Sequence, residues 1–199
     1  MKKFEVTSGK MVLSDPCYKI PTWCQGVVDR VKNGTWVTEA NKTDQDSWGE
    51  RVSYLVAFNE QALKENPALK ETLVNGWGKQ LPFDFGVDSG QFGFFDNEHY
   101  RNDKSAENLP KYDFGTDFSR GEEGEEWYTA ICDITLADEQ WGVLPFGVVS
   151  SSGFGDGSYS VFAVVNEYDE YVGFMAVFID ENEDDEDDED DEDDEEDEY

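Results

Sequence analysis

The residue types that could do chemistry lie in one aspartate–proline step and two glycine-rich runs. Asp15 precedes Pro16, so its carboxylate at a strand end could cap a turn or bind a cation. Residues 86–91 and 152–159 alternate glycine with Ser and Asp. Glycine permits tight turns and close backbone approach, so such loops can cradle a ligand; the alternative is an ordinary glycine-rich β-turn. The ligand-binding candidates are Asp15, Asp88, Ser89, Ser152, Gly153, Gly155, Asp156 and Tyr159.

No pattern in the chain predicts a reaction. Cys17 could act as a nucleophile only beside a base, and the single histidine is His99. Residues 153–157 lack the helix and final glycine of a dinucleotide loop, and neither a phosphate-binding P-loop nor a serine nucleophile elbow occurs. Enzymatic activity is therefore left open, with a hydrolase built on Asp carboxylates as the alternative, and we favour a protein that is not an enzyme, with no catalytic residue and no cofactor.

A metal site is a weaker alternative. Asp15, Asp88, Asp96 and Asp156 could bind a hard cation such as Ca²⁺ if their loops share one end of a barrel. In a chain with 47 acidic residues, four carboxylates near glycines are weak evidence, and we expect no metal.

The elements that must position these residues are mostly strands. Apolar, β-prone runs predict strands at 6–13, 51–58, 85–89, 91–95, 128–136, 158–165 and 171–179. Asn33-Gly34 between β-prone runs predicts a hairpin, and residues 166–170 predict the turn of a terminal hairpin. Residues 59–74 predict one short helical insert, a helix pair broken at Pro67 with Asn66 capping its second part. Residues 97–126 predict a long surface loop. This pattern is typical of a mostly β antiparallel sandwich or barrel.

Charge divides the chain into two parts. Of the 47 acidic residues, 18 lie at positions 180–198, which leaves 29 before Asp180 against 15 basic residues, a net of about −14. The aromatic fraction of 15% favours a folded body, because aromatic side chains bury large areas. We predict a β-rich globular domain at 1–179 and a disordered polyacidic tail at 180–199, which cannot bury enough apolar surface to fold.

The same composition limits location and partners. Cys17, Cys24 and Cys132 have no metal-type spacing, which favours reduced thiols in the cytoplasm. The start MKKFEVTSGK has no apolar run of a signal peptide, and no membrane-spanning run occurs. An acidic body should be repelled by nucleic acid and anionic membranes and attracted to a basic protein surface. The oligomeric state is left open.

The order of the short motifs resembles an uncharacterised domain family. Its members share the pattern SG…DP…RVA…VD-x-G…SG-x-GDG-x-Y. This chain has Ser8-Gly9, Asp15-Pro16, Arg51-Val52 (with Ser53 in place of the family's Ala), Val87-Asp88-Ser89-Gly90 and the run 152–159. The resemblance covers roughly residues 4–180. The runs at 15–18 and 150–157 are also similar to small hypothetical proteins of tailed bacteriophages. The resemblance implies a β-rich fold in a bacterial or phage setting, host cytoplasm if phage-encoded, and assigns no activity.

Two function classes follow from these observations. The first is a non-enzymatic acidic interaction protein that binds a basic protein surface of a host or phage protein, as an inhibitor or a DNA mimic. The alternative is a pocket protein that binds a small molecule or nucleotide-like signal through Asp88 and residues 153–157.

Overall fold

The computed structural model describes residues 1–76, 78–107, 109 and 122–180. Strands make up 43% of the structure and helices 20%, which confirms the mostly β prediction. No helix of the described part is both long and apolar enough to cross a membrane. The tail from residue 181 onward and positions 110–121 of the expected loop lie outside the described residues.

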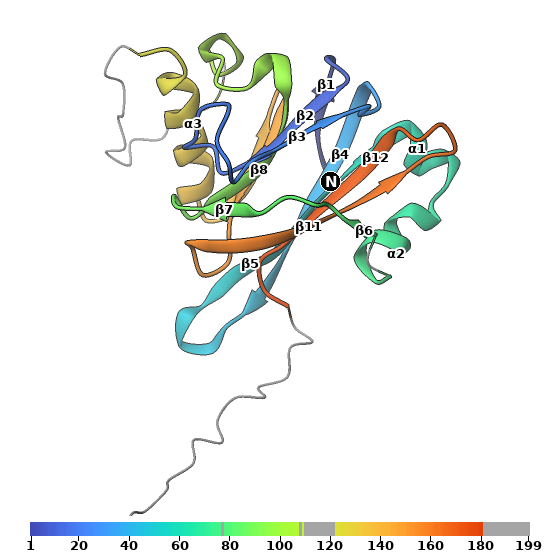
Figure 1. Cartoon of the computed structure of the whole chain (residues 1–199). Helices are drawn as coiled ribbons and strands as arrows, with labels where there is room; N and C mark the ends of the chain where they lie inside the picture. The colour runs from blue at the N-terminus through green and yellow to red at the C-terminus, as the bar shows by residue number, and fades with distance from the viewer. Residues whose placement is uncertain (77, 108, 110–121, 181–199) are drawn as a thin grey trace, which may run out of the picture.

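Two antiparallel sheets form the centre of the fold, and they do not close into a barrel (Figure 1). The first sheet has the order β1 (Lys2–Val6), β4 (Gly34–Asp44), β5 (Glu50–Asn59), β12 (Tyr171–Val177), β11 (Gly157–Val165) and β6 (Lys79–Gln80), with β7 (Phe85–Val87) also paired to β11. The second has the order β3 (Gly26–Asp29), β2 (Lys10–Ser14), β8 (Gln91–Asp96), β10 (Gly147–Ser151) and β9 (Trp141–Leu144).

The main core fills the space between the sheets. Leu13 and Phe94 from the second sheet meet Leu55 and Phe174 from the first, and all four are fully buried. The Trp36 ring stacks on Phe174 with 5.8 Å between ring centroids. Each such side chain stabilises the fold by roughly 2–3 kcal/mol through burial, so this sandwich core carries most of the stability.

Helices cover the outer face of each sheet. The helix pair α1 (Glu60–Glu65) and α2 (Ala68–Val74) packs on the first sheet through Leu69 and Leu73, and the predicted break at Pro67 is confirmed. Asn59 caps α1 by accepting a hydrogen bond from the Ala62 amide at 3.1 Å. The predicted cap at Asn66 is wrong, because that residue ends α1 and α2 begins after Pro67 without a side-chain cap.

The fold has a further helix that the sequence prediction missed. The run 128–136, predicted as a strand, belongs to α3 (Glu125–Leu136), which packs on β9 and β10 (Figure 1). Its buried residues Trp127, Ala130 and Ile131 meet the outer face of the second sheet with Ile134 at their edge. These positions have helical spacing, and that packing outweighs the β propensity of Thr and Ile. The single helical insert of the prediction is therefore incomplete.

Two local predictions also need correction. Residues 6–13 form two strands, because Ser8 and Gly9 turn the chain between β1 and β2 in different sheets. Asn33-Gly34 joins β3 and β4 across the two sheets and is not a hairpin turn. Its Asn33 side chain accepts a hydrogen bond from the Gly9 amide at 2.7 Å, and Gly34 has φ of +118°. The Asn-Gly step is thus used for a crossover between sheets.

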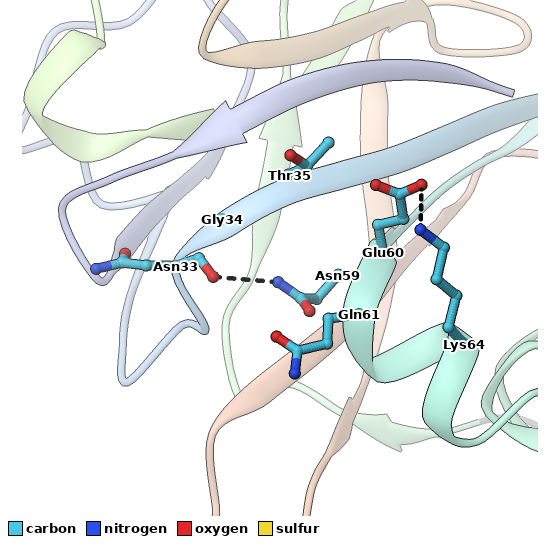
Figure 2. Close-up of a pocket in the computed structure, with 7 residues that line it drawn as sticks. All are labelled: Asn33, Gly34, Thr35, Asn59, Glu60, Gln61 and Lys64. Atoms are coloured by element: carbon cyan, nitrogen blue, oxygen red, sulfur yellow. Dashed lines mark hydrogen bonds and ion pairs between the residues drawn. The ribbon is translucent and has the colours of Figure 1, made fainter.

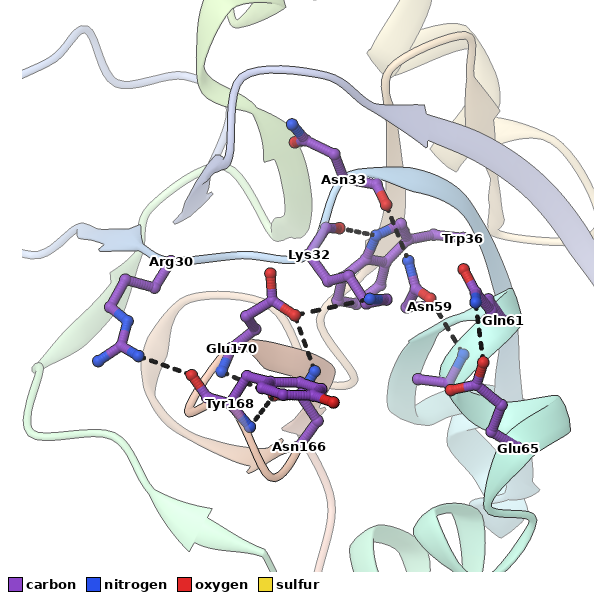
Figure 3. A network of polar contacts seen from close by, with 11 residues as sticks. Arg30, Lys32, Asn33, Trp36, Asn59, Gln61, Glu65, Asn166, Tyr168 and Glu170 are labelled. Atoms are coloured by element: carbon purple, nitrogen blue, oxygen red, sulfur yellow. Dashed lines mark hydrogen bonds and ion pairs between the residues drawn. The ribbon is translucent and has the colours of Figure 1, made fainter.

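The terminal hairpin of β11 and β12 is confirmed, and a polar network anchors its turn (Figure 3). Lys32 lies 3.5 Å from the Glu170 carboxylate, and Arg30 donates to the Tyr168 carbonyl at 2.7 Å. The Trp36 indole donates to the Lys32 carbonyl at 2.9 Å. The crossover and the last hairpin are therefore fixed to each other, and the network serves the fold.

Candidate functional site

Strand direction brings the predicted loops to one end of the second sheet. β2 and β10 both run antiparallel to the central β8, so both end beside its first residues. Ser14 is paired with Gly93, and Ser151 with Gln91. Asp15 and Ser152 each follow the last residue of a strand, which places them on either side of the turn at residues 88–90.

Asp15 holds that turn. Its carboxylate is fully buried and accepts four hydrogen bonds. Oδ1 accepts from the Cys17 amide at 2.8 Å and the Ser89 hydroxyl at 2.6 Å. Oδ2 accepts from the amides of Asp88 and Ser89 at 2.9 and 2.7 Å. A carboxylate is the side chain that can accept so many donors at once, so Asp15 joins β2 to the turn before β8.

The second glycine-rich run folds onto the same turn. The Ser152 amide donates to the Gly90 carbonyl at 3.0 Å, and the Ser152 hydroxyl donates to the Gly155 carbonyl at 2.9 Å. The Tyr159 hydroxyl lies 2.9 Å from the Ser152 carbonyl and 2.6 Å from that of Gly155. Burial raises the pKa of Tyr159, which keeps this hydroxyl protonated as a donor. The loop at 152–157 is therefore held rigidly by its own polar groups.

Glycine is required in this loop for two reasons. Gly153 and Gly155 have φ of +63° and +110°, a left-handed region that disfavours other residues. A Cβ at Gly153 would lie 3.1 Å from atoms of Phe178 and Ile179. The loop thus packs against the segment that leads from β12 into the acidic run at residue 180.

The structure therefore brings the eight candidate residues together, with two different roles. One group of side chains makes hydrogen bonds within the fold: those of Asp15, Ser89, Ser152 and Tyr159. Three backbone amides also donate hydrogen bonds within the fold: those of Asp88, Ser89 and Gly155. Asp88 and Asp156 expose their side chains. Three of the backbone donors that a ligand-binding nest could use, those of Asp88, Ser89 and Gly155, are already paired, and ligand binding at these residues stays a prediction.

Asp96 does not join this group. It lies at the opposite end of β8, where its Oδ2 accepts from the amides of Thr7 and Ser8 at 2.6 and 2.8 Å. The convergence of four aspartates is therefore wrong. Within residues 1–76, 78–107, 109 and 122–180, no group of three His, Cys, Asp or Glu side chains could hold a metal ion.

The thiols lie in surroundings that suppress their reactivity. Burial raises the pKa of Cys17, and the negative charges of Asp15 and Asp88 raise it further. Burial also raises the pKa of Cys132 on α3. His99 stacks on Phe146 with 3.5 Å between ring centroids and lies 3.4 Å from the Ser105 hydroxyl. Cys17 and Cys132 thus favour the protonated form, and His99 is engaged with other groups.

An exposed aromatic pair joins the loop at 152–157 to the connection between β4 and β5. Phe154 is 57% exposed, and its ring lies edge-on to that of Trp48, which is 66% exposed, with centroids 6.2 Å apart. Trp48 comes from the connection between β4 and β5. Asp46 in this connection is exposed, as are Asp44 at the end of β4 and Glu50 at the start of β5; Asp156 is exposed near Phe154 in the sequence. We call Trp48 and Phe154 the aromatic patch and these four carboxylates its acidic rim.

Neither Phe154 nor Trp48 was selected from the sequence. Trp36 is buried and Trp23 is 84% exposed, so proximity to a loop does not decide exposure. The signal for Phe154 was its place between two glycines of a polar turn, where no core-facing strand position is available.

A separate pocket of about 280 Å³ lies between the start of β4 and α1 (Figure 2). Asn59 there donates to the Asn33 carbonyl at 3.3 Å and caps α1. Lys64 and Lys3 bind Glu60 at 2.8 and 2.9 Å, and they lower its pKa. The polar groups that line this pocket already have partners within the fold. We therefore interpret the pocket as a packing boundary between β4 and α1, not as a binding site.

Comparison with known proteins identifies a family without an assigned activity. The model of the family described as "Protein of unknown function (DUF4241)" matches residues 4–176. No curated protein and no solved structure matches the chain. The matched span contains both loops of the site and all but the outermost residues of β1 and β12 in the two sheets. The chain therefore belongs to this uncharacterised domain family.

Proposed function

We propose that the protein is a non-enzymatic interaction protein that uses the aromatic patch and its acidic rim to bind a basic protein surface. The observation that carries the proposal is the exposed Trp48–Phe154 pair. Two large aromatic side chains from neighbouring connections can supply the desolvated centre of an interface at low entropy cost. The acidic rim supplies negative charge that attracts a basic surface.

Charge complementarity favours a basic partner. The exposed carboxylates of the acidic rim lie within four residues of Trp48 or Phe154 in the sequence, and Gly153 packs on the last residues before the acidic run at 180–198. A net of about −14 on residues 1–179 adds a long-range attraction that raises association rates with cationic surfaces. The same charge repels nucleic acid and anionic membranes, and imitation of DNA phosphates is a special case of this proposal. The phage-like runs support a bacterial cytoplasmic setting and an inhibitor of a host protein.

The second function class is ranked lower. A small-molecule site at Asp88 and residues 153–157 would need free backbone donors, and those of Asp88, Ser89 and Gly155 are already paired within the fold. The proposal therefore assigns these loops the task of presenting Phe154 and Asp156 to a protein.

The test is capture of proteins from a bacterial lysate by four immobilised forms: the wild type, Trp48→Ser, Phe154→Ser and Trp23→Ser. The third substitution is a matched control, because Trp23 is also exposed and lies outside the patch. We expect one basic protein to bind the wild type and the control, and to bind the two patch variants at least tenfold more weakly, about 1.4 kcal/mol.

The salt response separates charge from other driving forces. Exposed charges are screened over about 8 Å at physiological ionic strength, so affinity should fall steeply as salt rises. A captured protein that is acidic, equal binding by all four forms, no capture at all, or an affinity that does not change with salt would each contradict the proposal.

A further inference from the structure

A second open pocket, of about 540 Å³, lies on the side of the molecule where α3 ends. Its walls are the β4–β5 pair, through Lys42 and Arg51, and the chain from the end of α3 to β9, through Leu136, Asp138 and Gln140. Ser151, the last residue of β10, closes one side. The pocket contains none of the eight candidate residues or the aromatic patch.

Arg51 is exceptional among the cations of this acidic chain. Of 15 basic residues, all but Lys111 and Arg120 are described, and nine of these have a carboxylate within 4 Å. Among the others, Arg101 donates to the Pro16 carbonyl at 2.8 Å, and Lys79 and Lys104 are exposed to water. Within the described residues, Arg51 is the one half-buried cation without an ion pair or hydrogen bond.

The buried atom of Arg51 is its Nε, which has no hydrogen-bond partner. A buried donor left unpaired costs about 1–3 kcal/mol, and more when the group is charged, so native proteins rarely retain one without use. An oxyanion in the pocket would stabilise the guanidinium, because its two oxygens can accept from the two Nη groups, which are not among the buried unpaired atoms.

Several other polar groups that line the pocket are already paired. Lys42 lies 3.3 Å from the Glu50 carboxylate and donates to the Asp138 carbonyl at 3.2 Å. Gln140 donates to the Glu50 carbonyl at 3.0 Å and accepts from the Ser151 hydroxyl at 3.2 Å. The wall is therefore held in place before any ligand arrives, and Arg51 is the group left to bind it.

We propose that this pocket binds a small organic carboxylate, with its carboxylate on Arg51 and its apolar body against Leu136 and Ala137. Leu136 is 54% exposed, which leaves apolar surface for that body to cover. A doubly charged phosphate fits less well, because Glu50 and Asp138 also line the pocket and the carbonyl end of α3 faces it. This inference does not rest on the proposed protein partner, although Glu50 belongs both to the acidic rim and to the lining of this pocket.

The experiment uses the full-length, ¹⁵N-labelled protein and follows the amides of residues 135–140 by NMR. The probes are benzoate, its neutral isostere benzamide, and inorganic phosphate at equal ionic strength. We expect saturable shifts with benzoate, no saturable response with benzamide, and at least tenfold weaker binding of phosphate. Arg51→Gln should weaken benzoate binding by at least about tenfold, the size of a lost bidentate charge-assisted pair.

Two further variants keep the test decisive. Lys79→Gln removes the same charge from an exposed, unpaired position and should leave benzoate binding unchanged. Arg51→Lys keeps the charge without the planar fork and should also weaken binding, which covers the case in which Arg51→Gln fails to fold. Equal losses from Lys79→Gln and the Arg51 variants, tighter binding of phosphate, or no saturable shift with benzoate would overturn the proposal.

Discussion

Asp15 is the residue on which the site's geometry depends, and its effect on stability can be measured. Asp15→Asn replaces one of the two acceptor oxygens with an NH2 donor that faces the two donors this oxygen had accepted from. We expect a loss of about 3 kcal/mol in the free energy of unfolding, since hydrogen bonds to a charged group contribute about 1.5–3 kcal/mol each and only some are lost. Urea unfolding followed by tryptophan fluorescence gives the value.

The matched control is Asp156→Asn, which removes an exposed carboxylate from the same end of the sheet. It should change stability by less than about 0.5 kcal/mol, as surface substitutions usually do. Similar losses from both substitutions would show that Asp15 does not brace the turn.

At the scale of single residues, the sequence predicted the location of the candidate site more accurately than the roles of its residues. Asp15, Ser152 and Tyr159 were selected because carboxylates and hydroxyls among glycines can bind ligands, yet their polar atoms pair inside the fold. Phe154 and Arg51 were not selected as site residues. Exposure of an aromatic ring and isolation of a guanidinium depend on which segments pack nearby, and local spacing does not specify that.

α3 provides the prediction at the scale of elements. Gly124 precedes the helix and has no side chain to cap it, but the remote Asp103 carboxylate accepts from the amides of Gly124 and Trp127, each at 2.9 Å. Asp103→Ala should lower the free energy of unfolding by about 1–2 kcal/mol, because it removes an N-terminal cap and a favourable charge at the positive end of the helix. Thermal and urea unfolding check this.

Asp84→Ala is the control for that substitution. Asp84 is exposed and away from a helix end, so its replacement removes the same charge without removing a cap. It should cost less than about 0.5 kcal/mol. An Asp103→Ala protein as stable as Asp84→Ala would mean that the cap contributes nothing.

The elements that sequence patterns predicted are those whose signals are local. The break at Pro67 and the terminal hairpin around residues 166–170 follow from residue types at fixed positions, and both are confirmed. α3 was missed because residues 128–136 are rich in Thr and Ile, and its stability comes from packing on β9 and β10 and from a cap 21 residues away. The Asn33-Gly34 crossover was missed because the same dipeptide serves hairpins and links between sheets.

At the scale of the whole molecule, charge is the dominant feature, and removal of the acidic run tests how it affects folding. A chain ending at Asp180 loses 17 carboxylates and no apolar residue other than the final Tyr199. Residues 1–179 retain their net charge of about −14, so the truncation removes repulsion between two parts of like sign. The melting temperature in about 10 mM salt should stay unchanged or rise by roughly 1–3 °C, less than 1 kcal/mol for a domain of this size.

The difference should vanish near 1 M salt, where the screening length is about 3 Å. Differential scanning calorimetry of both chains at the two salt concentrations gives the comparison. A fall in melting temperature, or loss of a single cooperative transition, would mean that the acidic run contributes contacts to the folded domain beyond its charge.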